Sequence, residues 1–296
     1  MIFGESRVKD WYRKAMWGPG MSIATRLPAT WEQRVFRLLG RSAGHLARRK
    51  RKEVDENLRR VFSTGHGDNF PAIDTVVGRA FASHFANQYV GPTFLRCTRS
   101  TWSKYLSWEG LDHLAAAEQE DCGVVLAHPH MGPAQLPLHV LGLMGKDVTQ
   151  VGGGRVTRIQ LSDVGEWARN RRLSYESNMS VKLHDGRSYL RPLLRSLASG
   201  GIVLTAMDGT GGGKELGRRQ NCMVLGHSMP MPLGPVWLAL HGNARLHPLH
   251  CYRSRSGSSL YTAVIGSEIR LNRELPPDDG LKEGVGRLAI WLDSVL

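Results

Sequence analysis

Residues 123–135 read GVVLAHPHMGPAQ. The first part of this segment is a short apolar run without polar alternation, which is typical of a strand buried on both faces of a sheet. The second part is a turn that holds His128 and His130 and leads into an apolar helix expected over residues 134–144. A buried strand, a polar turn and a helix in succession are the repeating unit of α/β proteins.

The same unit recurs in the C-terminal half of the chain. The glycines at 200 and 201 are expected to end a helix that precedes a second buried strand. The expected strands are residues 146–151, 202–206, 244–252 and 261–265, and the expected helices are residues 190–199, 232–241 and 284–295. We therefore predict an α/β fold with a mostly parallel central sheet flanked by helices, preceded by an N-terminal helical segment.

The N-terminal third has helical periodicity instead. Helices are expected over residues 30–62, 71–96 and 111–120. In the first of them, Trp31, Val35, Leu38 and Leu39 share one face. We expect a helical segment over residues 1–100, facing a membrane or a partner, and a catalytic α/β region over residues 101–296, the two forming one continuous domain. Residues 1–30 mix aromatic and basic side chains, which fits an interfacial helix and a core-capping helix equally well.

Composition limits the classes of partner and the cellular compartment. The 296-residue chain carries a formal net charge of +13, which fits nucleic acid, an anionic membrane surface, an acidic protein or a solvated basic surface. Four cysteines without a C-x-x-C pair indicate a reducing compartment. No signal peptide is recognisable, and no apolar run reaches the ~18 residues that a membrane span requires. A cytoplasmic or peripheral protein is expected.

Polar side chains follow two of the predicted strands. Residues 123–127 run into His128 and His130, and residues 202–206 run into Asp208 and a glycine-rich loop. Because ligands bind beyond the carboxyl ends of strands in open α/β sheets, a pocket is predicted where these ends converge. A histidine there suits a general base, because its ordinary pKa allows proton transfer at neutral pH. The alternative is a turn histidine bonded to a backbone carbonyl.

The segment around His130 resembles the catalytic block of the lipid A biosynthesis acyltransferases, the lauroyl and myristoyl transferases related to the lysophospholipid acyltransferases. That block is a buried strand followed by H-x-x-x-x-E or H-x-x-x-x-D, often with glycine two positions after the histidine. His130 and Gly132 match it. The resemblance covers roughly residues 45–255, because three further segments agree with the family in order and spacing, namely EVDENLRRVF at 53–62, LLRSLASGGIVLTAMD at 193–208 and VLG at 224–226.

One departure from the family pattern lies at Gln135, where the family has the acidic partner of the histidine. An amide can orient an imidazole but cannot stabilise its protonated form by charge. Asp208 is the first candidate to replace the missing acid and Glu166 the second, while His128 is a candidate to assist as a neighbouring acid or base. A catalytically degenerate homologue that only binds acyl chains is the remaining interpretation.

The resemblance implies a reaction. His130 would deprotonate a hydroxyl or amine acceptor, which attacks a fatty acyl thioester carried by acyl carrier protein or coenzyme A. Backbone amides at Met131 and Gly132 would hold the oxyanion, and no metal or redox cofactor is needed. The expected location is cytoplasmic and peripheral to the inner face of the cell membrane. Further substrate-binding candidates are Arg155, Arg158 and Gly209, and other basic residues expected to face phosphates or acidic partners are Arg48–Lys52, Arg169, Arg171 and Arg172.

The residues also suggest two other classes of function. A metal-dependent hydrolase would use His128 and His130 with Asp208, and its further ligands would come from His184, His227 or His250. A nucleotide-binding loop at residues 209–214 fails on spacing, because Asp208 stands where the first glycine is required and Glu215 where serine or threonine is required. No motif for specific nucleic-acid recognition is present.

Overall fold

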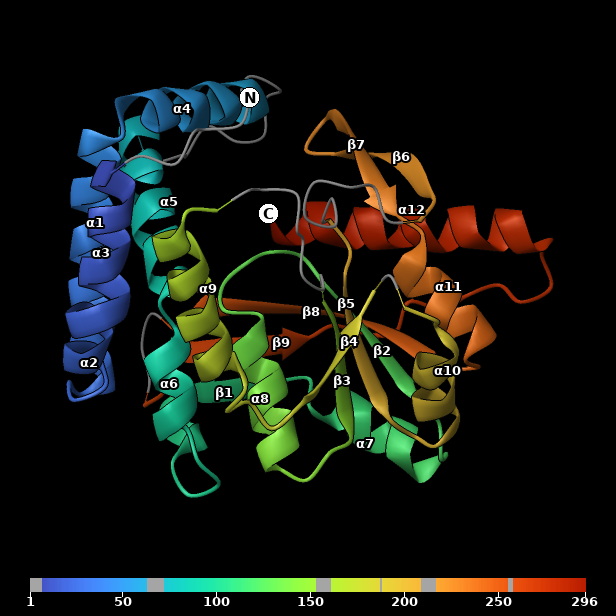
Figure 1. The fold of residues 1–296 in the computed structure, drawn as a ribbon. Helices are drawn as coiled ribbons and strands as arrows, with labels where there is room; N and C mark the ends of the chain where they lie inside the picture. Colours follow the sequence, from blue (N-terminus) through green and yellow to red (C-terminus); the bar gives the residue numbers. More distant parts are fainter. Residues whose placement is uncertain (1–6, 63–71, 153–160, 187, 209–216, 255–257) are drawn as a thin grey trace. The chain divides into compact units, whose positions relative to one another are not determined.

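The computed structural model describes residues 7–62, 72–152, 161–186, 188–208, 217–254 and 258–296. The chain forms two compact units, coloured along the sequence in Figure 1. The first unit comprises Met1–Tyr105 and Arg155–Met179, and the second comprises Leu106–Gly154 and Ser180–Leu296. Within the described ranges, no helix combines the length and the hydropathy that crossing a bilayer requires.

The first unit is helical. Its elements are α1 (Arg7–Ala15), a π-helical turn (Met16–Gly20), α2 (Met21–Ala24), α3 (Ala29–Leu46), α4 (Arg48–Phe62), α5 (Ile73–Gln88), α6 (Gly91–Arg96), a 3-10 turn (Trp102–Lys104) and α9 (Asp163–Glu176). An aromatic cluster holds these helices together, and the Phe36 ring stacks on Tyr89 with centroids 5.2 Å apart. Trp17 and Met21 are buried in the same cluster. The core-capping interpretation therefore holds for the second half of residues 1–30.

Helix α3 packs on α5 through a face with little apolar surface. Its buried residues include Phe36, Gly40 and Gly44. A Cβ atom at Gly40 would lie 2.7 Å from the backbone oxygen of Phe81 in α5, so the two helices approach closely at this glycine. The apolar face that the sequence predicts for α3 is instead exposed, since its residues are Trp31, Val35, Leu38 and Leu39, followed by Leu46.

A mixed sheet lies at the centre of the second unit. Its strands are β1 (Leu106–Glu109), β2 (Val124–His128), β3 (Val148–Gly152), β4 (Lys182–Asp185), β5 (Ile202–Ala206), β8 (Arg245–Arg253) and β9 (Tyr261–Ile265), in the order β1-β9-β8-β2-β5-β3-β4. Neighbouring strands are parallel except for the β8–β9 pair. The predicted α/β class with a mostly parallel sheet is confirmed.

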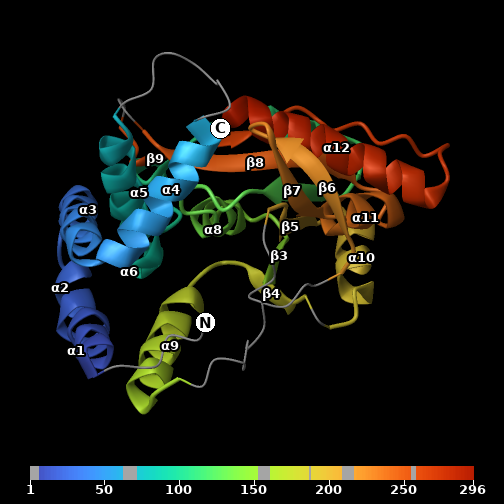
Figure 2. The same cartoon turned by 90° about the horizontal axis from the view of Figure 1, so that it is seen from above.

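Helices cover both faces of this sheet. On one face lie α10 (Arg191–Ala198), α11 (Gly234–His241) and α12 (Pro277–Val295), which pack against strand residues such as Val125 and Val203. On the other face lies α8 (Gln135–Leu143), as Figure 2 shows. Helix α7 (Asp112–Gln119) connects β1 to β2. Because helices shield both faces, the central strands contain the continuous apolar runs from which they were predicted.

Four strands and one helix were not predicted. Strands β1 and β4 lie at the edges of the sheet, where burial is partial and the apolar pattern is weak. Strands β6 (Arg219–Val224) and β7 (His227–Pro232) form a separate antiparallel hairpin, closed by Leu225 and Gly226 with φ of +50° and +72°. Helix α9 was missed because charged residues interrupt its apolar positions.

Candidate active site

The pairing of β2 with β5 positions the candidate active site. The two strands are parallel neighbours, and their last register pair joins His128 to Ala206. Backbone pairing continues one residue further, because the amide of Met207 donates to the carbonyl oxygen of His128 over 2.9 Å. His130 and Asp208 each stand two residues beyond the last register pair. The sheet register therefore brings these two side chains to the same edge.

His130 and Asp208 are joined by two hydrogen bonds. The backbone amide of His130 donates to Oδ2 of Asp208 over 2.8 Å, and Nδ1 of the imidazole lies 2.6 Å from Oδ1. A carboxylate can only accept, so Nδ1 carries the proton and Nε2 carries the lone pair. The His130 side chain is 66% exposed and that of Asp208 is 23% exposed. The imidazole is thus oriented by a mostly covered carboxylate while its own ring is open to solvent.

The pair sets opposite shifts in the pKa values of its members. The hydrogen bond that the His130 imidazole donates to Asp208 raises the pKa of His130 above its ordinary value, and burial opposes this effect. Burial disfavours ionisation of Asp208, but the hydrogen bonds from the His130 side chain and backbone outweigh it and lower the pKa of Asp208. Asp208 is therefore ionised at neutral pH and stabilises a proton on the imidazole.

His128 is in a different environment from His130. Its side chain is buried, and desolvation lowers its pKa to about 4. Its Nδ1 lies 3.0 Å from the carbonyl oxygen of Pro129, and its ring centroid lies 5.5 Å from that of His130. The ring is neutral at physiological pH, so His128 packs beside His130 as an uncharged side chain.

The turn after His130 depends on a glycine. Gly132 has a φ of +65°, and a Cβ atom there would lie 2.0 Å from the backbone oxygen of Cys251 in β8. Nothing in the sequence pattern pointed to this contact with Cys251. The Met131 amide donates to the carbonyl oxygen of Pro129 over 2.7 Å.

The other predicted site residues are distributed as follows. Gln135 begins α8 on the same turn as His130, but the carboxylate that contacts the imidazole belongs to Asp208. Glu166 belongs to the first unit, where it forms an ion pair of 2.5 Å with Arg169. Arg155, Arg158 and Gly209 lie outside the described residues.

The metal-site interpretation gains no support in the described part of the chain. No three His, Cys, Asp or Glu side chains come together there as a potential metal-binding group. His184, His227 and His250 stand on β4, β7 and β8, respectively. Nδ1 of His128 is hydrogen-bonded to the carbonyl oxygen of Pro129, and Nδ1 of His130 is hydrogen-bonded to Asp208.

Comparison with known proteins agrees with the resemblance around His130. The family model of the bacterial lipid A biosynthesis acyltransferases matches residues 11–279, which is most of the chain and includes the His130–Asp208 pair. No curated protein matches the sequence significantly. The family transfers acyl groups, and its model spans both units. The chain is therefore a member of the bacterial lipid A biosynthesis acyltransferase family and an enzyme of acyl transfer.

Proposed function

We propose that this enzyme moves a fatty acyl group from a thioester to a hydroxyl or amine of a lipid or metabolite acceptor, with His130 as the general base. The donor is an acyl thioester of acyl carrier protein or coenzyme A. The observation that carries the proposal is the bond between His130 Nδ1 and Asp208 Oδ1, because it leaves a basic Nε2 on an exposed imidazole in a protein of an acyltransferase family.

In the proposed reaction, Nε2 of His130 takes the proton of the acceptor as the acceptor oxygen or nitrogen attacks the thioester carbonyl. The tetrahedral intermediate then collapses, the carbon–sulfur bond breaks, and the leaving thiolate takes the proton from the imidazolium. Asp208 holds the ring and stabilises the imidazolium in between, as a carboxylate does in a serine hydrolase triad. The Gly132 amide is the proposed donor to the oxyanion.

The test of this proposal is acyl transfer by the purified full chain. The substrates are a radiolabelled acyl thioester and extracted bacterial lipids, and the variant is His130→Ala. We expect turnover to fall by about 10²–10⁴-fold, which is the usual contribution of a general base. His84→Ala is the matched control, because His84 is an exposed histidine on α5. Turnover by His130→Ala equal to that of the control would exclude His130 as the base.

The acceptor is to be identified by mass spectrometry of lipids from cells with and without the gene. We expect a deficit in the deletion strain, in which one lipid should carry one acyl chain fewer than in the parent strain. Complementation with His130→Ala should leave that deficit in place, whereas complementation with His84→Ala should remove it. A lipid profile unaffected by the deletion would argue for a small-metabolite acceptor.

We further propose that the enzyme is peripheral to an anionic membrane surface and that α3 is the contact. Leu38 is 61% exposed and Leu46 is 85% exposed, and Trp31, Val35 and Leu39 complete one apolar stripe along the helix. Arg34 and Arg41 flank this stripe at helical spacing. An apolar face bordered by arginines is the composition of a helix that lies in the lipid interface.

Vesicle flotation tests the membrane contact. The variant Trp31→Ala/Leu38→Ala should bind vesicles of phosphatidylcholine and phosphatidylglycerol at least tenfold more weakly than the wild type. Ile290→Ala is the control, because Ile290 is a similarly exposed apolar residue on α12. Unaltered flotation of the double variant would refute the assignment. A change in molar mass by light scattering would instead assign the stripe to contact between copies of the chain.

A further inference from the structure

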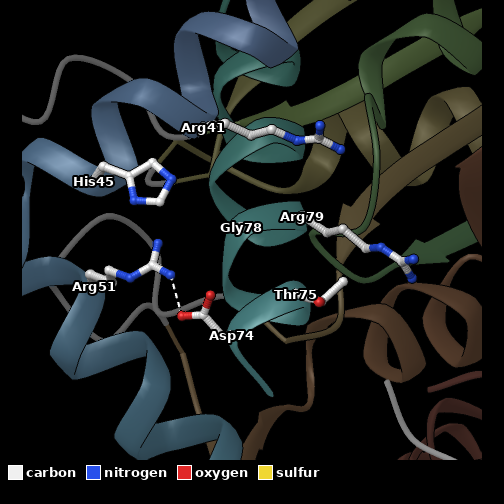
Figure 3. Close-up of a pocket in the computed structure, with 7 residues that line it drawn as sticks. All are labelled: Arg41, His45, Arg51, Asp74, Thr75, Gly78 and Arg79. Atoms are coloured by element: carbon white, nitrogen blue, oxygen red, sulfur yellow. Dashed lines mark hydrogen bonds and ion pairs between the residues drawn. The ribbon is translucent and has the colours of Figure 1, made fainter. Parts of the chain in front are cut away.

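A cavity of about 300 Å³ opens in the first unit between helices α3, α4 and α5. Figure 3 shows its lining residues arranged around Gly78 of α5. The residues that line this basic cavity are Arg41, His45, Arg51, Asp74, Thr75, Gly78 and Arg79. None of them belongs to the unit that holds His130 and Asp208. The basic cavity is thus a feature that the proposed acyl transfer does not explain.

The basic cavity carries an excess of positive charge. It is lined by three arginines and by a single carboxylate, that of Asp74. This carboxylate is bound to the guanidinium of Arg51. Among the described residues, neither Arg41 nor Arg79 has an ion pair or a side-chain hydrogen bond. Cations gathered around one hollow repel each other, and an anion placed between them removes this repulsion.

Gly78 faces open space in the basic cavity. A Cβ atom at Gly78 would meet no atom within 4 Å, although glycine weakens the interior of a helix relative to alanine. The glycines of α3 have a packing reason that Gly78 lacks, because a Cβ atom at Gly44 would lie 2.8 Å from the Phe81 ring of α5. The helices therefore meet closely at Phe81 and leave room one turn earlier, at Gly78.

The hydrogen-bond donors around the basic cavity suit a tetrahedral oxyanion. Guanidinium groups offer forked N–H donors that match phosphate oxygens, and the Thr75 hydroxyl adds one further donor. We propose that the basic cavity binds the phosphate group of an anionic ligand, with Arg41 and Arg79 as its principal contacts. This inference does not depend on the chemistry at His130.

The position of the basic cavity on α3 bears on the source of the phosphate. Leu38, Arg41 and His45 follow one another at spacings of three and four residues, so they lie along one side of the helix. The phosphate site therefore adjoins the exposed apolar stripe. A phospholipid headgroup and a soluble phosphate ester both carry the required group, and separate probes distinguish them.

The test measures binding of the full chain to two probes. One probe is vesicles of phosphatidylcholine with 20 mol% phosphatidic acid, and the other is inorganic phosphate followed by calorimetry. The variant Gly78→Leu fills the cavity without altering charge, and Arg41→Ala/Arg79→Ala removes the donors. Gly286→Leu is the matched control for the first, because a Cβ atom at Gly286 of α12 also meets no atom within 4 Å. Arg26→Ala/Arg191→Ala is the control for lost charge, because both arginines are exposed.

We expect both cavity variants to weaken binding to phosphatidic acid vesicles about tenfold or more, and both controls to stay within about twofold of the wild type. Loss of phosphate binding with unaffected vesicle binding would support the site and assign it to a soluble phosphate ester. Binding by Gly78→Leu equal to that of Gly286→Leu for both probes would overturn the proposal. A wild-type protein that binds neither probe would also overturn the proposal. Circular dichroism establishes that each variant is folded.

Discussion

Nδ1 of His130 lies 2.6 Å from Oδ1 of Asp208, although 78 residues separate the two in the chain. The family pattern places the acid five residues after the histidine, where this chain has Gln135. Asp208 reaches the imidazole from the neighbouring strand and also binds the backbone amide of His130. The carboxylate that contacts His130 therefore stands two residues beyond the end of β5 and not at position 135.

Replacing Asp208 by asparagine should lower the rate of acyl transfer by about 10²–10⁴-fold. The amide keeps the size of the side chain but loses the charge that stabilises the imidazolium, and an amide donor favours the wrong tautomer of the ring. The measurement is turnover of the labelled thioester at saturating substrate. Asp112→Asn is the control, because Asp112 is an exposed aspartate at the start of α7. A rate for Asp208→Asn within threefold of that control would remove Asp208 from the mechanism.

The pH dependence of the wild type should show an acid limb governed by His130. The base must be neutral to accept a proton, and Asp208 raises the pKa of His130 above its ordinary value of 6.5. Activity should therefore fall as the pH is lowered, with a midpoint above 6.5. His128 does not titrate in this range, because burial lowers its pKa to about 4. In Asp208→Asn the midpoint should move to lower pH, and an unmoved midpoint would assign the limb to another group.

Gln135→Glu should change the rate of acyl transfer by less than about threefold. Nδ1 of His130 is already bound to the Asp208 carboxylate. Because the neutral imidazole has a single N–H group, a second acid at position 135 would find no ring N–H left to bind. The measurement is turnover of the variant beside the wild type at several pH values. A gain of more than tenfold would show that His130 lacks an effective carboxylate and would favour the degenerate homologue.

Gly132→Ala should destabilise the fold by about 2–5 kcal/mol. Part of this cost comes from a left-handed backbone, about 1–2 kcal/mol, and the rest from the overlap with the carbonyl of Cys251. Gly145→Ala separates the two contributions, because Gly145 has a φ of +90° but a Cβ atom there meets no atom within 4 Å. Urea unfolding measures both variants. Equal losses would show that the close approach to Cys251 carries no cost.

Local sequence was sufficient for the buried strands and for the helices that follow them. The runs at residues 123–127 and 202–206 are continuously apolar because helices cover both faces of the sheet. This pattern can be recognised without knowing which elements pack beside the strands. The edge strands β1 and β4 and the hairpin of β6 and β7 lack that burial, so their pattern was too weak to predict. In α3 the sequence predicted the apolar face correctly, but the face that is buried is the one whose glycines let α5 approach closely.

The sequence by itself determined the fold class, the family and a histidine placed just beyond a buried strand, because each of these depends on a pattern within one segment. Only the tertiary structure decided which carboxylate contacts that histidine. The order of parallel strands is set by packing across the whole sheet, and placing β5 beside β2 in this register brings Asp208 to His130. The basic cavity likewise exists only once α3, α4 and α5 are packed, since its arginines come from three separate helices.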